Sequence, residues 1–236
     1  MFIDREKELG ELNKFYDEDR FQFVVVYGRR RVGKTFLLLE FCKDKPCIFF
    51  TAKETSERDM LEGFSQSVFS FFGLKGLTSF DSWEKAFQFL AGRARNERLV
   101  VVLDEFPYMV NSSKSLPSTL QKLIDHELSN TRLFLIVCGS SMSFMEKEIL
   151  SYKSPLYGRR TGQLLVEPFD FFNARKFFPK YSFDEQVVVY GVLGGIPQYL
   201  KAFDQEKDVY ENIRSQILSK TSFLYEEPMF LLRQEL

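Results

Sequence analysis

The chain has 236 residues, of which 44% are hydrophobic, and 32 Lys and Arg stand against 33 Asp and Glu. This length and composition suit one α/β domain with a smaller appendage, and they exclude a disordered chain. The net charge is near zero, so the chain as a whole does not attract nucleic acid or an anionic membrane. Any such binding would need a local cluster of basic residues.

The N-terminal segment 1–7 is too charged for a signal peptide. No apolar stretch in the sequence approaches the 18 or more residues of a membrane span. These features predict a cytoplasmic protein that does not bind a membrane.

The most informative segment is 28–35, which reads G-R-R-R-V-G-K-T and directly follows the apolar run 23–27. It matches G-x-x-x-x-G-K-[ST], the phosphate-binding loop, or Walker A motif. After a strand, backbone N–H groups of this loop and the start of the next helix converge on a nucleotide phosphate. The segment therefore predicts a nucleotide as ligand.

Each part of the loop has an expected task. Gly28 and Gly33 avoid a Cβ that would forbid the turn or hold the backbone away from phosphate. Lys34 is expected to bridge the β- and γ-phosphates and to act in catalysis, and Thr35 to place its hydroxyl on Mg²⁺. The residues expected to bind the nucleotide here are Gly28, Arg29, Arg30, Arg31, Val32, Gly33, Lys34, Thr35 and Phe36.

Beyond the loop, helical and strand patterns alternate up to about residue 168 and only helical patterns follow. Helices are expected at 35–41, 56–72 and 82–94, with Asp81 capping the last, and strands at 47–51, 99–103, 133–138 and 163–166. Such alternation indicates β-α-β units and a parallel sheet. The later helices are expected at 171–178, 183–193, 197–203 and 208–218. We therefore expect a P-loop core at 1–168 and, at 169–236, a helical lid followed by the start of a C-terminal segment.

Two acids end the buried strand 99–103. Asp104 is placed to reach the hydration shell of Mg²⁺ from the same sheet edge as the loop, as in a Walker B motif. Glu105, the next residue, is placed to polarise a water for attack on the γ-phosphate. The alternative is an ordinary strand end with two solvated acids, which the phosphate loop makes implausible.

Two further segments could complete a catalytic site. Ser140, preferred to Ser141, follows the strand 133–138 and could touch the γ-phosphate or the attacking water as a sensor, or could instead cap the next helix. Arg159 and Arg160 precede the last strand. In multimeric ATPases an arginine at this place projects into the neighbour's site. A solvated basic turn or a phosphate contact in cis remains the alternative.

With these residues assembled, the chain resembles the archaeal-type ATPase family, a branch of the signal-transducing STAND group of P-loop ATPases related to AAA+ and origin-recognition ATPases. The resemblance covers essentially the whole chain. Residues 2–9 are similar to the group's hydrophobic-x-R-E-x-E-L motif, and residues 194–197 resemble its G-x-P lid motif. The resemblance implies that the first motif, which contains Arg5, borders the adenine and that Pro197 packs near it.

The resemblance also implies the architecture and the partners. We expect an α/β fold of the ASCE P-loop type, with a parallel sheet of order 5-1-4-3-2, helices on both faces and a small helical lid. Family members usually continue into a winged-helix segment and a further, often nuclease-like domain. This chain ends at Leu236 within a helical pattern, which suggests a partial gene. DNA could be a partner through such a missing domain, and a homo-oligomer or a partner protein is possible.

The leading hypothesis is an ATP-binding, Mg²⁺-dependent ATPase that acts as a nucleotide-driven switch, with ATP closing the lid and hydrolysis reopening it. An alternative is a nucleotide-gated DNA-binding module with slow hydrolysis, for which Arg29, Arg30, Arg31 and Arg159 offer local charge. A small-molecule kinase or a GTPase is less favoured. The sequence has no N/T-K-x-D guanine-reading motif, and Asp104-Glu105 suits water activation.

Overall fold

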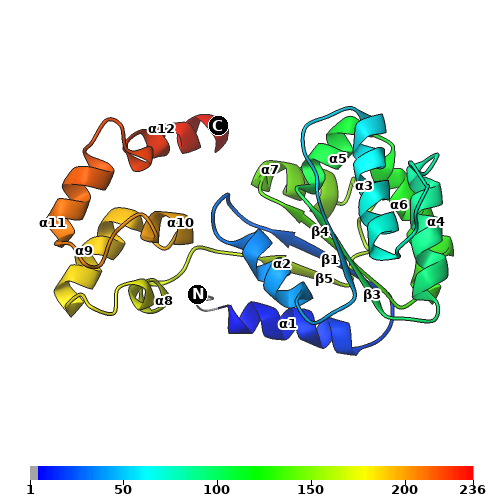
Figure 1. Ribbon diagram of the computed structural model, residues 1–236, viewed down its shortest axis with the longest axis horizontal. Coiled ribbons are helices and arrows are strands. Elements are labelled where there is room, and N and C mark those ends of the chain that lie inside the picture. The colour runs from blue at the N-terminus through cyan, green and yellow to red at the C-terminus, as the bar shows by residue number, and fades with distance from the viewer. Residues whose placement is uncertain (1–4, 236) are drawn as a thin grey trace. The chain divides into compact units, whose positions relative to one another are not determined.

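A computed structural model describes residues 5–235 of the chain, with side chains described through residue 233 (Figure 1). Its contacts divide it into two compact units. The sheet unit comprises Glu6–Arg29 and Lys34–Val166. The helical unit comprises Arg30–Gly33 and the described parts of Met1–Arg5 and Glu167–Leu236. The chain therefore passes from one unit to the other and back within the phosphate loop.

Five parallel strands form the sheet, in the order β2-β3-β4-β1-β5. Their bounds are β1 Gln22–Tyr27, β2 Cys47–Thr51, β3 Leu99–Asp104, β4 Leu133–Gly139 and β5 Gly162–Leu165. The predicted order 5-1-4-3-2 is the same order read from the opposite edge, so this prediction is confirmed. β1, β3 and β4 are buried along their whole length. This burial accounts for their uninterrupted apolar sequences.

The sheet register brings the ends of the central strands to one edge. Tyr27 pairs with Gly139, and Leu103 pairs with Val137. Because the strands are parallel, the residues that follow β1, β3 and β4 leave the sheet on the same side. This edge is where a doubly wound sheet places its ligand site.

Helices cover both faces of the sheet. Those of the sheet unit are α1 Glu6–Asp17, α2 Lys34–Cys42, α3 Glu57–Phe71, α4 Trp83–Ala94, α5 Phe106–Ser112, α6 Leu116–His126 and α7 Met142–Phe144. A short 3-10 turn follows α6 at Leu128–Asn130, and a π-helix, Met145–Leu150, follows α7. Asp81 was expected to cap α4, and this is wrong. The cap is Ser82, whose hydroxyl accepts the N–H of Lys85 and so satisfies a free donor of the first turn.

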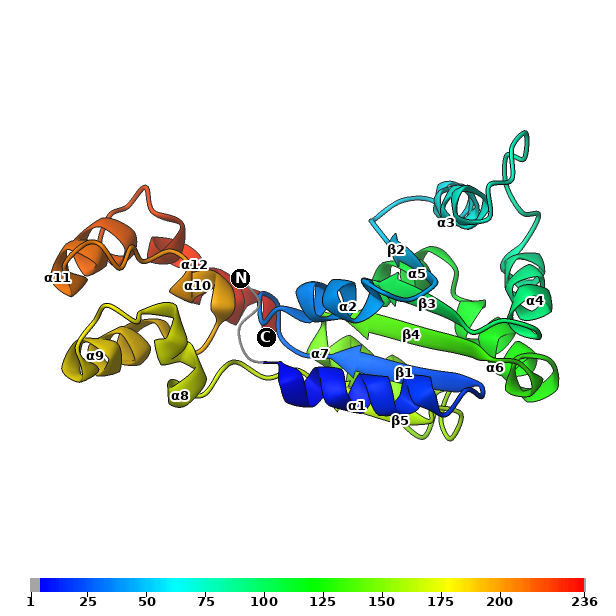
Figure 2. The same ribbon diagram turned by 60° about the horizontal axis from the view of Figure 1, so that its bottom comes forward.

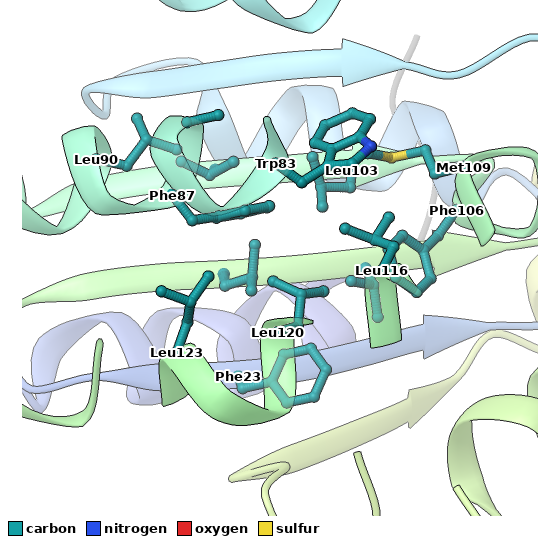
Figure 3. Close-up of a cluster of buried hydrophobic side chains, with 14 of the residues drawn as sticks. Phe23, Trp83, Phe87, Leu90, Leu103, Phe106, Met109, Leu116, Leu120 and Leu123 are labelled. Atoms are coloured by element: carbon teal, nitrogen blue, oxygen red, sulfur yellow. The ribbon is translucent and has the colours of Figure 1, made fainter. Parts of the chain in front are cut away.

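One face of the sheet carries the main core (Figure 3). Phe23 of β1 and Leu103 of β3 contribute to a cluster with Phe87 of α4, Phe106 of α5 and Leu120 of α6. Each of these side chains is fully buried. Burial of one such side chain stabilises a fold by about 1.5–3 kcal/mol. The packing of these side chains therefore fixes the positions of the strands that end at the candidate site.

The opposite face is covered by α1 and α2, which lie side by side in both views (Figures 1 and 2). The ring of Phe134 in β4 meets Phe41 of α2 edge to face, with centroids 5.6 Å apart, and stacks on Tyr16 of α1 at 6.5 Å. This packing fixes α2, the helix that begins at the phosphate loop.

The helical unit has its own small core. Its helices are α8 Phe171–Ala174, α9 Phe183–Leu193, α10 Pro197–Leu200, α11 Val209–Asn212 and α12 Phe223–Glu235, with a 3-10 turn at Arg175–Phe177 and a π-helix at Ile213–Ile217. Phe178 and Tyr181 stack with centroids 5.4 Å apart, and the Tyr181 hydroxyl donates to two backbone carbonyls. Within residues 5–235, none of the helices has the length and apolar character needed to cross a bilayer.

Candidate nucleotide site

The phosphate loop needs glycine at its first position. Gly28 has a φ of 153°, which L side chains rarely adopt, and a Cβ there would lie 2.2 Å from the carbonyl oxygen of Val166. Gly33 has a φ of +95°. Both positions therefore require glycine on conformational grounds, before any ligand is considered. The backbone conformation expected of these two glycines is present, and their part in binding a nucleotide stays a prediction.

Lys34, the first residue of α2, has its charged end inside the loop. Its Nζ donates to the carbonyl oxygens of Gly28 and Arg29, at 2.8 Å each, and the residue is only 6% exposed. A buried ammonium needs such acceptors because desolvation is costly. The loop backbone thus curls around a positive charge, as a site for a polyanionic ligand requires.

Thr35 and Asp104 join the loop to the end of β3. The Thr35 hydroxyl donates to Asp104 Oδ2 at 2.9 Å, and the backbone N–H of Glu105 donates to Oδ1 at 3.1 Å. Asp104 is 2% exposed. Both carboxylate oxygens are therefore oriented by hydrogen bonds, one from the adjacent residue and one from Thr35, 69 positions away in the sequence.

Cys138, at the end of β4, is a further neighbour of Asp104. Burial raises the pKa of the Cys138 thiol well above its ordinary value, and the charge of Asp104 together with a hydrogen bond to it adds to the rise. The thiol therefore stays protonated beside the carboxylate. Sequence reasoning missed this residue, although its position next to Gly139 on the strand paired with β3 could have indicated it.

These oxygens suit Mg²⁺. A hydroxyl and a carboxylate are hard oxygen ligands, and Mg²⁺ in phosphate-binding sites takes few protein ligands and keeps several waters. Thr35 and Asp104 are in direct contact, so the two side chains lie close enough to share one ion. The two residues assigned to the metal from the sequence thus fit the group.

Glu105 has an unusual backbone conformation at the start of α5. Its φ and ψ are 52° and 43°, the left-handed region, which costs an L residue roughly 1–2 kcal/mol. Both of its carboxylate oxygens accept from the Ser140 hydroxyl at 3.1 Å. Strain of this kind persists where surrounding contacts fix the residue, and it is common at functional sites. The side chain is half-buried.

The two candidate serines differ in what they do. Ser140 reaches Glu105, as described. Ser141 occupies the cap position of α7 but makes no capping hydrogen bond through its side chain. The structure therefore brings the preferred sensor candidate to the predicted water-activating acid, a contact that the sequence did not specify.

The two arginines before β5 have partners in their own chain. Arg159 donates to both carboxylate oxygens of Asp125 in α6, at 2.9 and 2.8 Å. This hydrogen bond lowers the pKa of Asp125 and raises that of Arg159. Arg160 donates to the carbonyl of Leu150 at 3.3 Å. Their action in a neighbouring subunit stays a prediction, and for Arg159 it requires the pair with Asp125 to break.

The remaining candidates lie in the helical unit or at the surface. Arg5 is buried, donates to the carbonyls of Val32 at 3.0 Å and Glu167 at 2.7 Å, and lies 4.3 Å from the Phe169 ring centroid. Pro197 lies beside Gly33, 4.0 Å from the place of a Cβ. Arg5 therefore holds the tip of the loop, Arg30–Gly33, through the Val32 carbonyl, and Pro197 is a neighbour of the tip. Those at the surface are Arg29, Arg30 and Phe36.

Arg31 makes contacts that sequence reasoning missed. It forms an ion pair with Glu227 of α12, and its guanidinium lies 4.4 Å from the Phe223 ring centroid. The Tyr199 hydroxyl donates to Glu227 Oε1 at 2.7 Å. No local pattern indicates a contact between residues so distant in sequence.

The loop, the buried acid that follows a central strand and the sheet order together define a P-loop nucleoside triphosphatase. The family model for an ATPase domain predominantly from Archaea matches residues 2–203. The chain belongs to this family and is, at the family level, a nucleotide-binding ATPase domain.

Individual proteins are similar to the chain in sequence or in fold. An uncharacterized protein of Methanocaldococcus jannaschii is 36% identical over 235 residues, which is all of this chain but 51% of that protein, so the chain spans about half its length. The Walker-type ATPase of Pyrococcus abyssi has a TM-score of 0.72 at 23% identity, covering 99% of this chain and 76% of that one. The Aeropyrum pernix ORC1 protein in complex with DNA has a TM-score of 0.60 at 15% identity, covering 91% and 66%. These two structures share the fold.

Proposed function

We propose that the chain binds ATP with Mg²⁺, hydrolyses it and works as a nucleotide-driven switch. The observation that carries this proposal is the hydrogen bond between Thr35 and Asp104, next to the enclosed ammonium of Lys34. It joins the two halves of a Walker-type site, which a chance G-K-T sequence would not do.

The residues of the sheet unit divide the work. When ATP binds, Lys34 exchanges its hydrogen bonds with the loop carbonyls for hydrogen bonds with the β- and γ-phosphates. Its charge neutralises negative charge that develops during phosphoryl transfer. Thr35 and Asp104 would hold Mg²⁺, which neutralises the phosphate oxygens when bound. Glu105 orients a water and accepts its proton, while Ser140 fixes the position of the carboxylate.

The switch proposal rests on the course of the chain. Arg30–Gly33 pack with the helical unit, whereas Lys34 and Thr35 begin α2 of the sheet unit. A phosphate bound by the loop is therefore expected to act on the helical unit through the continuous backbone. Nucleotide can shift an equilibrium between conformations only if it binds them with different affinity.

The proposal is tested by titrating the purified protein with ATP, ADP and GTP in the presence of Mg²⁺. Lys34→Ala should abolish tight ATP binding. Lys43→Ala is the control because Lys43 lies just after the same helix and is exposed. Equal ATP binding by Lys34→Ala would refute the proposal. A preference for GTP, or stoichiometric phosphorylation of a metabolite, would favour the GTPase or kinase alternative.

The DNA-binding alternative gains no support from the described contacts. The relative from Aeropyrum pernix is described in complex with DNA. In this chain, however, two of the four arginines that offered local charge have carboxylate partners, since Arg31 pairs with Glu227 and Arg159 with Asp125. DNA binding that depends on salt and changes with ATP would favour this alternative, whereas no binding at low salt would remove it for this chain.

A further inference from the structure

An ion pair between a half-buried arginine and a buried glutamate joins the tip of the phosphate loop to α12. Arg31 and Glu227 are in contact, and their side chains are 29% and 7% exposed. Phe223, also of α12, packs against the guanidinium, and Tyr199 of α10 donates to the carboxylate. All four residues belong to the helical unit.

The burial of Glu227 makes its pairing with Arg31 important for the position of the carboxylate. A carboxylate that is almost fully buried needs a positive partner, and removing that partner leaves an uncompensated charge. Tyr199 alone supplies a single neutral donor. Glu227 and Arg31 therefore constrain each other's positions.

The backbone of Arg31 has a conformation that side-chain contacts could help to maintain. Its φ is +69°, in the left-handed region that L side chains disfavour. Arg31 also lies in the middle of the loop 28–35. The backbone N–H groups of such a loop point at the bound phosphate. A loop with this residue in another backbone conformation would direct those groups elsewhere.

The other contacts of the tip involve different loop residues. Arg5 holds the Val32 carbonyl, and Pro197 lies against Gly33. Of these three contacts of the tip, the one made by the Arg31 side chain is the contact with α12. Because α12 is the last helix of the described chain, this link connects the loop with the C-terminal end of the helical unit.

We propose that Glu227 is a positioning residue for nucleotide binding. Through Arg31 it holds the loop tip in the phosphate-binding conformation, and nucleotide on the loop in turn stabilises α12. Such coupling is reciprocal, since a contact that favours ligand binding must itself be favoured by the ligand. The inference rests on the proposed function, because it assumes that the loop binds a nucleotide.

The test uses Glu227→Gln, which keeps the size of the side chain and an acceptor for Tyr199 but removes the charge. Glu226→Gln is the matched control, because Glu226 is exposed and lines the same cavity as Arg31 and Glu227. Arg31→Gln and the double variant complete a mutant cycle. For each protein, the Kd of Mg-ATP, the turnover at saturating ATP and the melting temperature are measured.

Glu227→Gln should raise the Kd of Mg-ATP between about 5-fold and about 100-fold, the usual range of coupling between sites. Turnover at saturating ATP should stay within about twofold, because Glu227 touches no reacting atom. Glu226→Gln should behave as wild type. The double variant should bind no more weakly than the worse single variant, because both remove the same contact.

Hydrogen exchange separates positioning from mere stability. Without nucleotide, amides of residues 30–33 should exchange faster in Glu227→Gln than in Glu226→Gln at equal distance from the melting temperature. With ATP, amides of α12 should gain protection in wild type and not in Glu227→Gln. Wild type that binds no nucleotide would refute the proposed function. Wild type that binds, with Glu227→Gln binding equally well, would overturn this inference alone, as would independent losses in the mutant cycle.

Discussion

Replacing Asp104 by Asn should separate the metal-dependent part of ATP binding from the rest. Asn has the same shape, and its carbonyl can accept the N–H of Glu105 as Asp104 does at 3.1 Å. Its amide group then faces the Thr35 hydroxyl, which can act as the acceptor. The substitution removes one charge from a residue that is 2% exposed and leaves the surrounding packing in place.

The magnitudes follow from the two interactions of the carboxylate. Loss of its charge-assisted hydrogen bond with Thr35 costs about 1.5–3 kcal/mol. This loss is offset in part because Asn, unlike the carboxylate, carries no charge whose desolvation opposes folding. We therefore expect the free energy of unfolding to change by less than about 2 kcal/mol. Two unit charges about 4 Å apart interact by about 4 kcal/mol at an effective dielectric constant of 20. We expect attraction to Mg²⁺ to exceed repulsion from the phosphates, because the ion carries two charges and would lie closer to the carboxylate.

The expected result is a change in opposite directions. With Mg²⁺, Asp104→Asn should bind ATP roughly 100-fold more weakly, equivalent to about 3 kcal/mol. With excess chelator only the repulsion between Asp104 and the phosphates is lost, so ATP should bind as well as to wild type or better. Calorimetric titration under both conditions measures the two constants. Equal weakening with and without Mg²⁺ would refute the assignment of Asp104 to the metal.

Two further predictions concern contacts of the site and its surroundings. Ser140→Ala should lower the rate of single-turnover hydrolysis by roughly 10- to 100-fold, because a hydrogen bond to a charged group is worth about 1.5–3 kcal/mol. The Kd of Mg-ATP should stay nearly unchanged. Hydrolysis as fast as that of wild type would contradict the role of Ser140. Asp125→Asn removes the partner of Arg159, whose hydrogen bond lowers the pKa of Asp125 in the folded state. The lowered pKa adds stability above the unfolded value of about 4, and this stability is lost as the pH falls through the folded value. The stability difference between wild type and Asp125→Asn, below about 1 kcal/mol for an exposed pair, should therefore shrink as the pH is lowered and close once wild-type Asp125 is protonated. Denaturant unfolding from pH 7 to pH 2.5 checks this, and a difference that widens in acid would contradict it.

Much of the sheet unit could be predicted because its signals are local. The buried strands are continuous apolar runs, and the phosphate loop is a fixed pattern of glycines with Lys34 and Thr35. The strand order was implied by resemblance to a family and is confirmed. The cap of α4 was predicted wrongly because Asp81 and Ser82 are both good caps, and only the backbone geometry selects between them.

Contacts between distant residues could not be predicted in the same way. The predicted strand order makes β3 and β4 neighbours, but the register that brings Ser140 to Glu105 is not visible in a single sequence. The pair of Arg31 with Glu227 and that of Arg159 with Asp125 join segments that share no pattern. Their existence depends on packing of whole helices, so the sequence gives only the charges and not the partners.

Single-turnover hydrolysis of ATP by excess purified protein, compared between wild type and Glu105→Gln, tests the central claim most directly. Glu105 is the side chain assigned to the attacking water, and Gln keeps its shape while it can no longer accept a proton. Wild type should release phosphate in a Mg²⁺-dependent reaction, and Glu105→Gln should bind Mg-ATP with nearly the same Kd but leave it intact. Phosphate release at equal rates by both proteins would contradict the account.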